Sequence, residues 1–136
     1  MAYVPCKKGT VLVPSGPSYD QDKKHLFIIC TDECADKKFL IVPVSSWTNN
    51  LCDSTCVIEP HEHSFVKHKS YVLYRNGLII SRADLEAGVL QMKIFPKEDM
   101  NGQSFLRIKN GVCVSQYTPR NIKNYFGCEV SKPESA

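Results

Sequence analysis

The chain has 136 residues, a formal net charge of +3 and 23% charged residues. This length predicts one domain around one core, and the small charge excludes a histone-like cationic excess while permitting nucleic-acid binding. We expect a single domain over residues 1–130 and a flexible polar tail over residues 131–136.

The chain contains seven cysteines. An odd number of cysteines, behind an N-terminal segment too short and too polar for a signal peptide, predicts reduced thiols and a cytoplasmic protein. Cys30 and Cys113 lie in apolar runs, so we expect both to be small core residues. No segment is long and apolar enough to predict a membrane-spanning helix.

The first half of the chain is predicted to be β-structure. Runs of apolar and β-branched residues predict strands over residues 10–14, 25–31, 39–46 and 55–58. The second run is continuously apolar and predicts burial on both faces. Pro43 lies inside the third strand and predicts an edge position or a bulge, because proline cannot donate a ladder hydrogen bond. The turn-rich residues 15–24 predict a loop after the first strand.

The middle of the chain continues this pattern. Residues 70–74 and 77–81 predict two strands or one bent strand. Ser81 is followed three residues later by Asp84, a spacing that predicts the N-terminal cap of a short helix.

The last third is predicted to be helical. Pro96 suits the first turn of a helix towards Lys109 that ends at Asn110–Gly111. A second helix is predicted between a capping Thr118 and a terminating Gly127. The whole pattern predicts a mainly β, α+β fold with short helices in the C-terminal third.

Residues 59–75 hold three of the four histidines together with lysines, an arginine, serines and tyrosines. Metal-free cleavage of RNA needs a base, an acid and cations beside the phosphate. We assign His63 and His68 as the candidate acid–base pair, and Lys67 and Arg75 as candidate phosphate ligands. Three further residues could donate hydrogen bonds or stack bases: Ser70, Tyr71 and Tyr74. The alternative is a polar loop whose histidines form local hydrogen bonds and whose lysines are simply solvated.

Three residues outside this segment are also candidates. His25 opens the second predicted strand directly after two lysines and could contact a phosphate. Ser45 and Ser46 end the third predicted strand, where a strand-to-loop junction commonly binds ligands. The alternatives are a half-exposed histidine at a strand edge and a pair of turn-capping serines.

A metal site is the competing chemical interpretation. Cys52 and Cys56 are followed by His61 and His63, and this set of four could hold a structural zinc ion. The spacing between the cysteines is unusual for zinc, so we expect neither a metal nor another cofactor.

Several motifs resemble the PemK/MazF family of toxins, the endoribonucleases of bacterial toxin–antitoxin pairs. Residues 8–13 resemble the family's opening glycine and apolar strand, and residues 25–29 resemble the strand after its first long loop. Residues 39–46 are the closest match, an apolar strand containing Val-Pro and ending in a Ser or Thr pair. Residues 70–75 occupy the place of a later active-site strand.

This resemblance implies an SH3-like barrel with added helices, which forms a homodimer, cuts single-stranded RNA without metal and is neutralised by an antitoxin protein. It places Ser45 or Ser46 at the family's active-site Ser/Thr, and we assign Ser46 as catalytic and Ser45 as substrate-binding. The chain departs from the family at two places, with Lys24-His25 where an Arg-Pro is usual and Thr10 where an Asp is usual. These departures leave a second hypothesis open, a non-catalytic barrel that binds nucleic acid or a protein partner.

Overall fold

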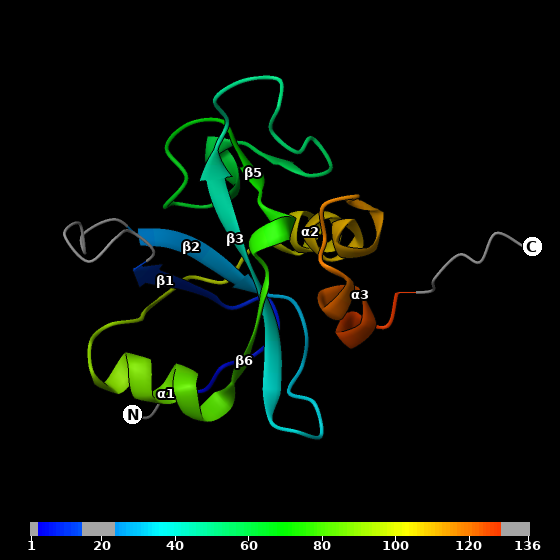
Figure 1. Cartoon of the computed structure of the whole chain (residues 1–136). Helices are drawn as coiled ribbons and strands as arrows, with labels where there is room; N and C mark the ends of the chain where they lie inside the picture. Colours follow the sequence, from blue (N-terminus) through cyan, green and yellow to red (C-terminus); the bar gives the residue numbers. More distant parts are fainter. Residues whose placement is uncertain (1–2, 15–23, 129–136) are drawn as a thin grey trace, which may run out of the picture.

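The computed structural model describes residues 3–14 and 24–128, which form a mixed α+β fold around a mainly antiparallel sheet (Figure 1). The elements in chain order are β1 (Thr10–Pro14), β2 (Lys24–Ile29), β3 (Lys38–Ser46), β4 (Val57–Ile58), the 3₁₀ turn η1 (Pro60–Glu62), β5 (Ser70–Val72), the 3₁₀ turn η2 (Tyr74–Asn76), β6 (Leu78–Ser81), α1 (Arg82–Leu90), β7 (Phe95–Lys97), α2 (Gly102–Val114) and α3 (Arg120–Phe126). The tail predicted over residues 131–136, and all but Lys24 of the loop predicted over residues 15–24, lie outside the described residues. Within the described ranges, no helix is long and apolar enough to cross a membrane.

The sheet is built around β3. Its seven strands follow the order β4-β5-β3-β2-β1-β7, and β6 also pairs with β3. One side of β3 pairs with β2, while the other side pairs first with β6 and then with β5. The path between β4 and β7 is open, so the described strands do not close into the expected barrel.

Pro43 lies in the centre of this sheet, and the predicted edge position is wrong. Pro43 pairs with Phe27 of β2, and its carbonyl accepts a hydrogen bond from the Leu73 backbone N–H at 2.8 Å. On that side β6 pairs as far as Ile41 and β5 begins at Val44. The N–H that proline lacks would point to the same side as its carbonyl, into this junction, so neither ladder loses a hydrogen bond.

The sheet is covered on both faces, as the continuously apolar second strand predicts. Alternate residues of β2 and β3 enter two separate cores. The larger core receives Ile28 and Val42, and α2 and α3 cover it. The smaller core receives Phe27 and Ile41, and α1 covers it through Leu85. Figure 1 accordingly shows α1 apart from α2 and α3.

The predicted cap at Ser81 is confirmed, whereas the helix predicted to start at Pro96 is wrong. The Ser81 hydroxyl accepts the Asp84 N–H at 3.0 Å and starts α1. Pro96 instead belongs to β7, which pairs with β1 at the edge of the sheet, where proline is tolerated. Helix α2 begins later, at Gly102, and the Asn101 side chain caps it.

The end of α2 also differs from the prediction. The helix passes Asn110–Gly111 and continues to Val114. A Cβ built on Gly111 would lie 2.0 Å from the Tyr74 Oη atom, so the glycine makes room for a buried tyrosine. That hydroxyl donates a hydrogen bond to the Ile108 carbonyl at 2.7 Å. Gly111 is therefore a packing residue within the helix, and a glycine with that role is indistinguishable in sequence from a stop.

Helix α3 ends as predicted, at Gly127 in the left-handed conformation with φ of 87°. Its start differs, because Pro119 occupies the N-cap position that was predicted for Thr118. The buried Thr118 hydroxyl makes no hydrogen bond to any described residue.

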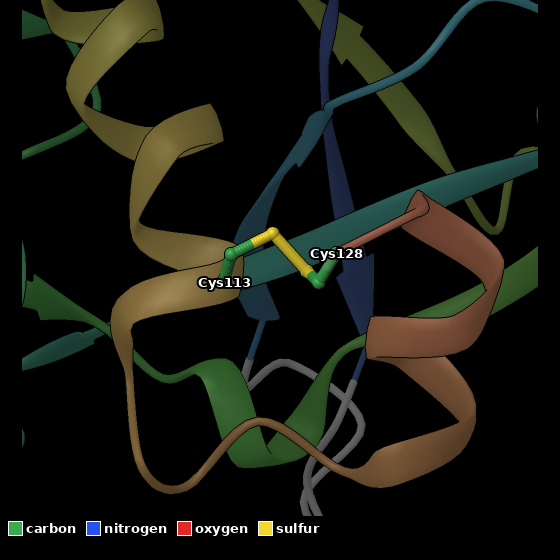
Figure 2. Close-up of a disulfide and its surroundings, with 2 residues drawn as sticks. All are labelled: Cys113 and Cys128. Carbon is green, nitrogen blue, oxygen red and sulfur yellow. A yellow bond between two sulfur atoms is a disulfide. The ribbon is translucent and has the colours of Figure 1, made fainter. Parts of the chain in front are cut away.

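The expectation that all thiols are reduced is wrong. A disulfide joins Cys113 near the end of α2 to Cys128 just after α3 (Figure 2). Cys113 is exposed and is not the core residue that its apolar neighbours predict, whereas Cys30 is buried as predicted. Five cysteines are free: Cys6, Cys30, Cys34, Cys52 and Cys56.

The contact between Tyr74 and Gly111 gives a first prediction. Gly111→Ala forces the tyrosine out of its place and should lower the free energy of unfolding by about 1–3 kcal/mol, the usual cost of overpacking. Gly102→Ala is the matched control, because no atom lies within 4 Å of its added Cβ and α2 gains a better helix former. Urea unfolding of both variants checks this, and equal midpoints would contradict the packing argument.

The disulfide gives a second prediction. Cys113 and Cys128 are 15 residues apart, so loss of the link should cost about 3 kcal/mol of unfolding free energy. The Cys113→Ser/Cys128→Ser variant should melt at a lower temperature than the oxidised parent and should not respond to a dithiol reductant. Mass spectrometry of the intact parent should show a gain of two hydrogen masses on reduction. A parent with no such mass change would show that the pair is not linked.

Candidate functional site

A cavity of about 540 Å³ opens at the C-terminal end of β3. The start of β2, the end of β3 and the segment before β5 form its walls. Leu26, Val44 and Val66 form its apolar floor and belong to the larger core. The cavity therefore lies where that core reaches the surface.

The pairing of β3 with β5 explains how polar side chains reach this cavity. Ser46 lies directly opposite Ser70 in the antiparallel register. The Ser70 hydroxyl donates a hydrogen bond to the His68 carbonyl at 2.9 Å, and the His68 ring meets Ser46, with 2.6 Å between Nε2 and Oγ. The end of β3 and the start of β5 therefore hold a histidine and a hydroxyl in direct contact at the cavity wall.

The opposite wall comes from β2. Lys24 and His25 line the cavity together with Lys67, which precedes His68 on the first wall. Among the described residues that line the cavity, none is acidic. The two lysines and two histidines among these described lining residues favour an anionic ligand.

Six of the residues predicted from sequence thus line one cavity: His25, Ser45, Ser46, Lys67, His68 and Ser70. Sequence reasoning left out Lys24 and Thr48, which also line it. Both positions carried a signal, because Lys24 directly precedes His25 and Thr48 lies two residues after Ser46, on the same face of an extended chain.

His63 does not line the cavity. Its side chain is completely buried, and its Nε2 atom lies 3.1 Å from Thr10 Oγ1 and 3.0 Å from the Glu98 carbonyl. This differs from the predicted pairing of His63 with His68, and the second histidine of the cavity is His25. Residues five apart in a loop can face opposite ways, which sequence spacing alone does not reveal.

The remaining three candidates also lie outside the cavity lining. Arg75 is exposed on η2. Tyr74 is buried in the larger core. Tyr71 is buried and packs edge-on against Trp47, with 5.8 Å between the ring centroids. Burial and a hydrogen bond with Cys52 raise the pKa of Tyr71.

The zinc alternative gains no support from the described residues. Cys56 is buried, His61 is exposed and His63 is held by Thr10 and Glu98. Backbone hydrogen bonds from Thr48 and then Asn49 lower the pKa of Cys52 to about 7. No group of three or more His, Cys, Asp or Glu residues within the described ranges is arranged to hold a metal ion.

No family model matches the chain, and no curated protein matches it.

The contact between Glu98 and Ser64, next to the cavity wall, gives a pH-dependent prediction of stability. Hydrogen bonds from the side chain and backbone of Ser64 lower the pKa of Glu98 from 4.5 to about 2. Glu98 therefore contributes stability above pH 4.5, and this contribution is lost as the pH falls towards 2. Glu98→Gln should be less stable than the parent at pH 6, and the difference should shrink between pH 4.5 and 2.

Urea unfolding at a series of pH values measures this difference. Asp84→Asn is the control, since Asp84 is an acid outside this contact and its substitution should not reproduce the pH profile. A constant difference between Glu98→Gln and the parent across the whole range would contradict the assignment.

Proposed function

We propose that this chain is a metal-independent endoribonuclease that cleaves single-stranded RNA in the cavity at the end of β3. One observation carries the proposal: His68 contacts Ser46 at 2.6 Å in a cavity that is also lined by His25 and two lysines. The imidazoles of His68 and His25 can act as base and acid on the two walls, and the lysines can balance phosphate charge.

In this proposal His68 is the base and His25 is the acid. His68 takes the proton of the ribose 2′-hydroxyl, and the 2′-oxygen then forms a bond to phosphorus. The bond from phosphorus to the 5′-oxygen breaks, and His25 gives its proton to that oxygen. The products are a 2′,3′-cyclic phosphate and a 5′-hydroxyl, so atoms and charge balance without a metal ion.

The other cavity residues have supporting roles. Ser46 orients the His68 ring through their hydrogen bond. Lys24 and Lys67 supply positive charge for the phosphate, and Ser45 and Ser70 border the same space. Phe65 is partly exposed at the rim and can stack on an unpaired base.

The wider biological role in the proposal comes from the motif resemblance. The closest motif match, the strand that ends in the serine pair, is β3, and it ends at the cavity. This supports a toxin of the PemK/MazF type, related to the SH3-like barrels, that acts in the cytoplasm as a homodimer and is neutralised by an antitoxin protein. Purification of the chain with a small protein encoded beside it would test that partner.

A second candidate is a module that binds RNA or another phosphorylated ligand without cleaving it. The observation that favours it is that no arginine is found among the described residues that line the cavity, while Arg75 lies elsewhere. Arginine is the residue best suited to bidentate phosphate recognition, and its absence weakens transition-state stabilisation more than ground-state binding.

Cleavage of a long single-stranded RNA in EDTA distinguishes the two functions. We expect fragments with cyclic-phosphate ends from the parent, and a loss of about 10²–10⁴-fold in kcat/KM for His68→Ala and for His25→Ala. His61→Ala is the matched control, because this exposed histidine lies outside the cavity and should leave cleavage unchanged.

A DNA strand of the same sequence lacks the 2′-hydroxyl and should remain intact. Undiminished cleavage by both cavity variants would refute the proposed acid–base pair. RNA that stays intact but binds, with binding weakened by Lys67→Ala, would establish the non-catalytic module.

A further inference from the structure

The buried His63 ring lies where three parts of the chain meet. Its Nε2 atom faces Thr10 of β1 and the carbonyl of Glu98, which follows β7. Its Nδ1 atom accepts the backbone N–H of Phe65 at 3.0 Å. The Thr10 hydroxyl in turn donates to the same Glu98 carbonyl at 2.6 Å. Each ring nitrogen therefore has a fixed partner.

These partners determine which nitrogen carries the proton. An N–H can only donate, so the Nδ1 atom that faces Phe65 carries no hydrogen. The Thr10 proton is directed to the Glu98 carbonyl, so Thr10 Oγ1 presents lone pairs to His63 Nε2. Nε2 consequently carries the ring hydrogen and shares it between two acceptors. A ring bound in this way has no nitrogen available for proton transfer with a substrate.

The same contacts fix one wall of the cavity. Residues 65–68 line it consecutively. The wall is held at its start by Nδ1 of His63, which binds the Phe65 N–H, and by the His63 carbonyl, which accepts the Val66 N–H at 3.1 Å. It is held at its end by the Ser70 hydroxyl on the His68 carbonyl. The position of His68 between these two anchors depends on His63.

We propose that His63 is a positioning residue, which ties the wall formed by residues 65–68 to β1 and to the segment after β7 and so directs His68 Nε2 towards Ser46. The functional consequence of this role rests on the proposed ribonuclease activity. The orientation of His68 itself can be measured without RNA, so the two proposals can fail separately.

Two substitutions of His63 each remove a different part of its hydrogen bonding. In His63→Asn, the amide oxygen replaces Nδ1 and can still accept the Phe65 N–H as an Asx-turn, but it is too short to reach Thr10 or Glu98. In His63→Gln, the amide nitrogen can still reach the Glu98 carbonyl, but the Phe65 N–H loses its acceptor. Thr10→Val is the matched control, because the Glu98 carbonyl remains available to His63 Nε2 and the wall is untouched.

The first measurement is nitrogen-15 NMR of the histidine rings in the parent protein. We expect His63 at neutral pH as the Nε2–H tautomer with an unprotonated Nδ1 atom, and His68 with a hydrogen-bonded Nε2 atom. Proton occupancy of Nδ1 in His63 would overturn the proposal before any variant is made.

The variants then test positioning. In His63→Asn and His63→Gln, folded by circular dichroism, the His68 ring signals should lose the hydrogen-bonded shift, and kcat should fall by about 10²-fold with a smaller change in KM. Thr10→Val should keep both properties. Unchanged His68 signals and kcat in either folded His63 variant would refute the positioning role.

A parent without ribonuclease activity, whose His68 signals still respond to His63, would refute the proposed function and leave the positioning role in place.

Discussion

The change of partner along β3 is the constraint on which the rest of the structure depends. One side of this strand pairs with β6 and then with β5, and the other side pairs with β2. Pro43 lies where the change occurs, so the sheet accommodates a residue without an N–H at its centre. Because β5 pairs only with the last residues of β3, the ends of the two strands arrive together and bring Ser46 level with Ser70.

Some side chains of the polar segment between β4 and β5 contact other parts of the fold, and others line the cavity. Burial opposes ionisation of Glu62, yet its hydrogen bonds with Ser104, Glu59 and Arg107 lower its pKa. Arg107 also donates to the Val57 carbonyl at 3.0 Å, so α2 holds η1 and the start of β4. Glu62 and His63 contact other parts of the fold, whereas Lys67 and His68, which follow them, line the cavity. A rigid support that holds charged side chains in place suits a binding site for an anion.

Much of the sheet could be predicted from the sequence, because long apolar runs such as those of β2 and β3 indicate strands whatever their neighbours are. Strand β7 could not be predicted. Its three residues include Pro96, which in sequence resembles the first turn of a helix, and only the pairing with β1 identifies them as a strand. The disulfide between Cys113 and Cys128 was also missed, because pairing depends on distance in space and not on the cysteine count.

The sequence predicted the types of residue in the site, but it predicted only some of the side chains that point into the cavity. The segment rich in histidine and lysine and the serine pair both contribute to the cavity. The choice between His63 and His25 required the fold, because a loop gives no periodicity from which to infer where each ring points. Tyr74 presents the same difficulty, since its hydroxyl donates to the Ile108 carbonyl in the core although polar Arg75 and Asn76 follow it in sequence.

The close fit of Tyr74 against Gly111 has an evolutionary consequence. The two residues belong to different elements, η2 and α2, and neither tolerates an arbitrary change while the other is retained. A larger residue at position 111 requires a smaller one at position 74, so the pair should covary among sequences that share this fold. Co-occurrence of tyrosine and glycine at these two positions would identify distant relatives whose cavity residues have diverged.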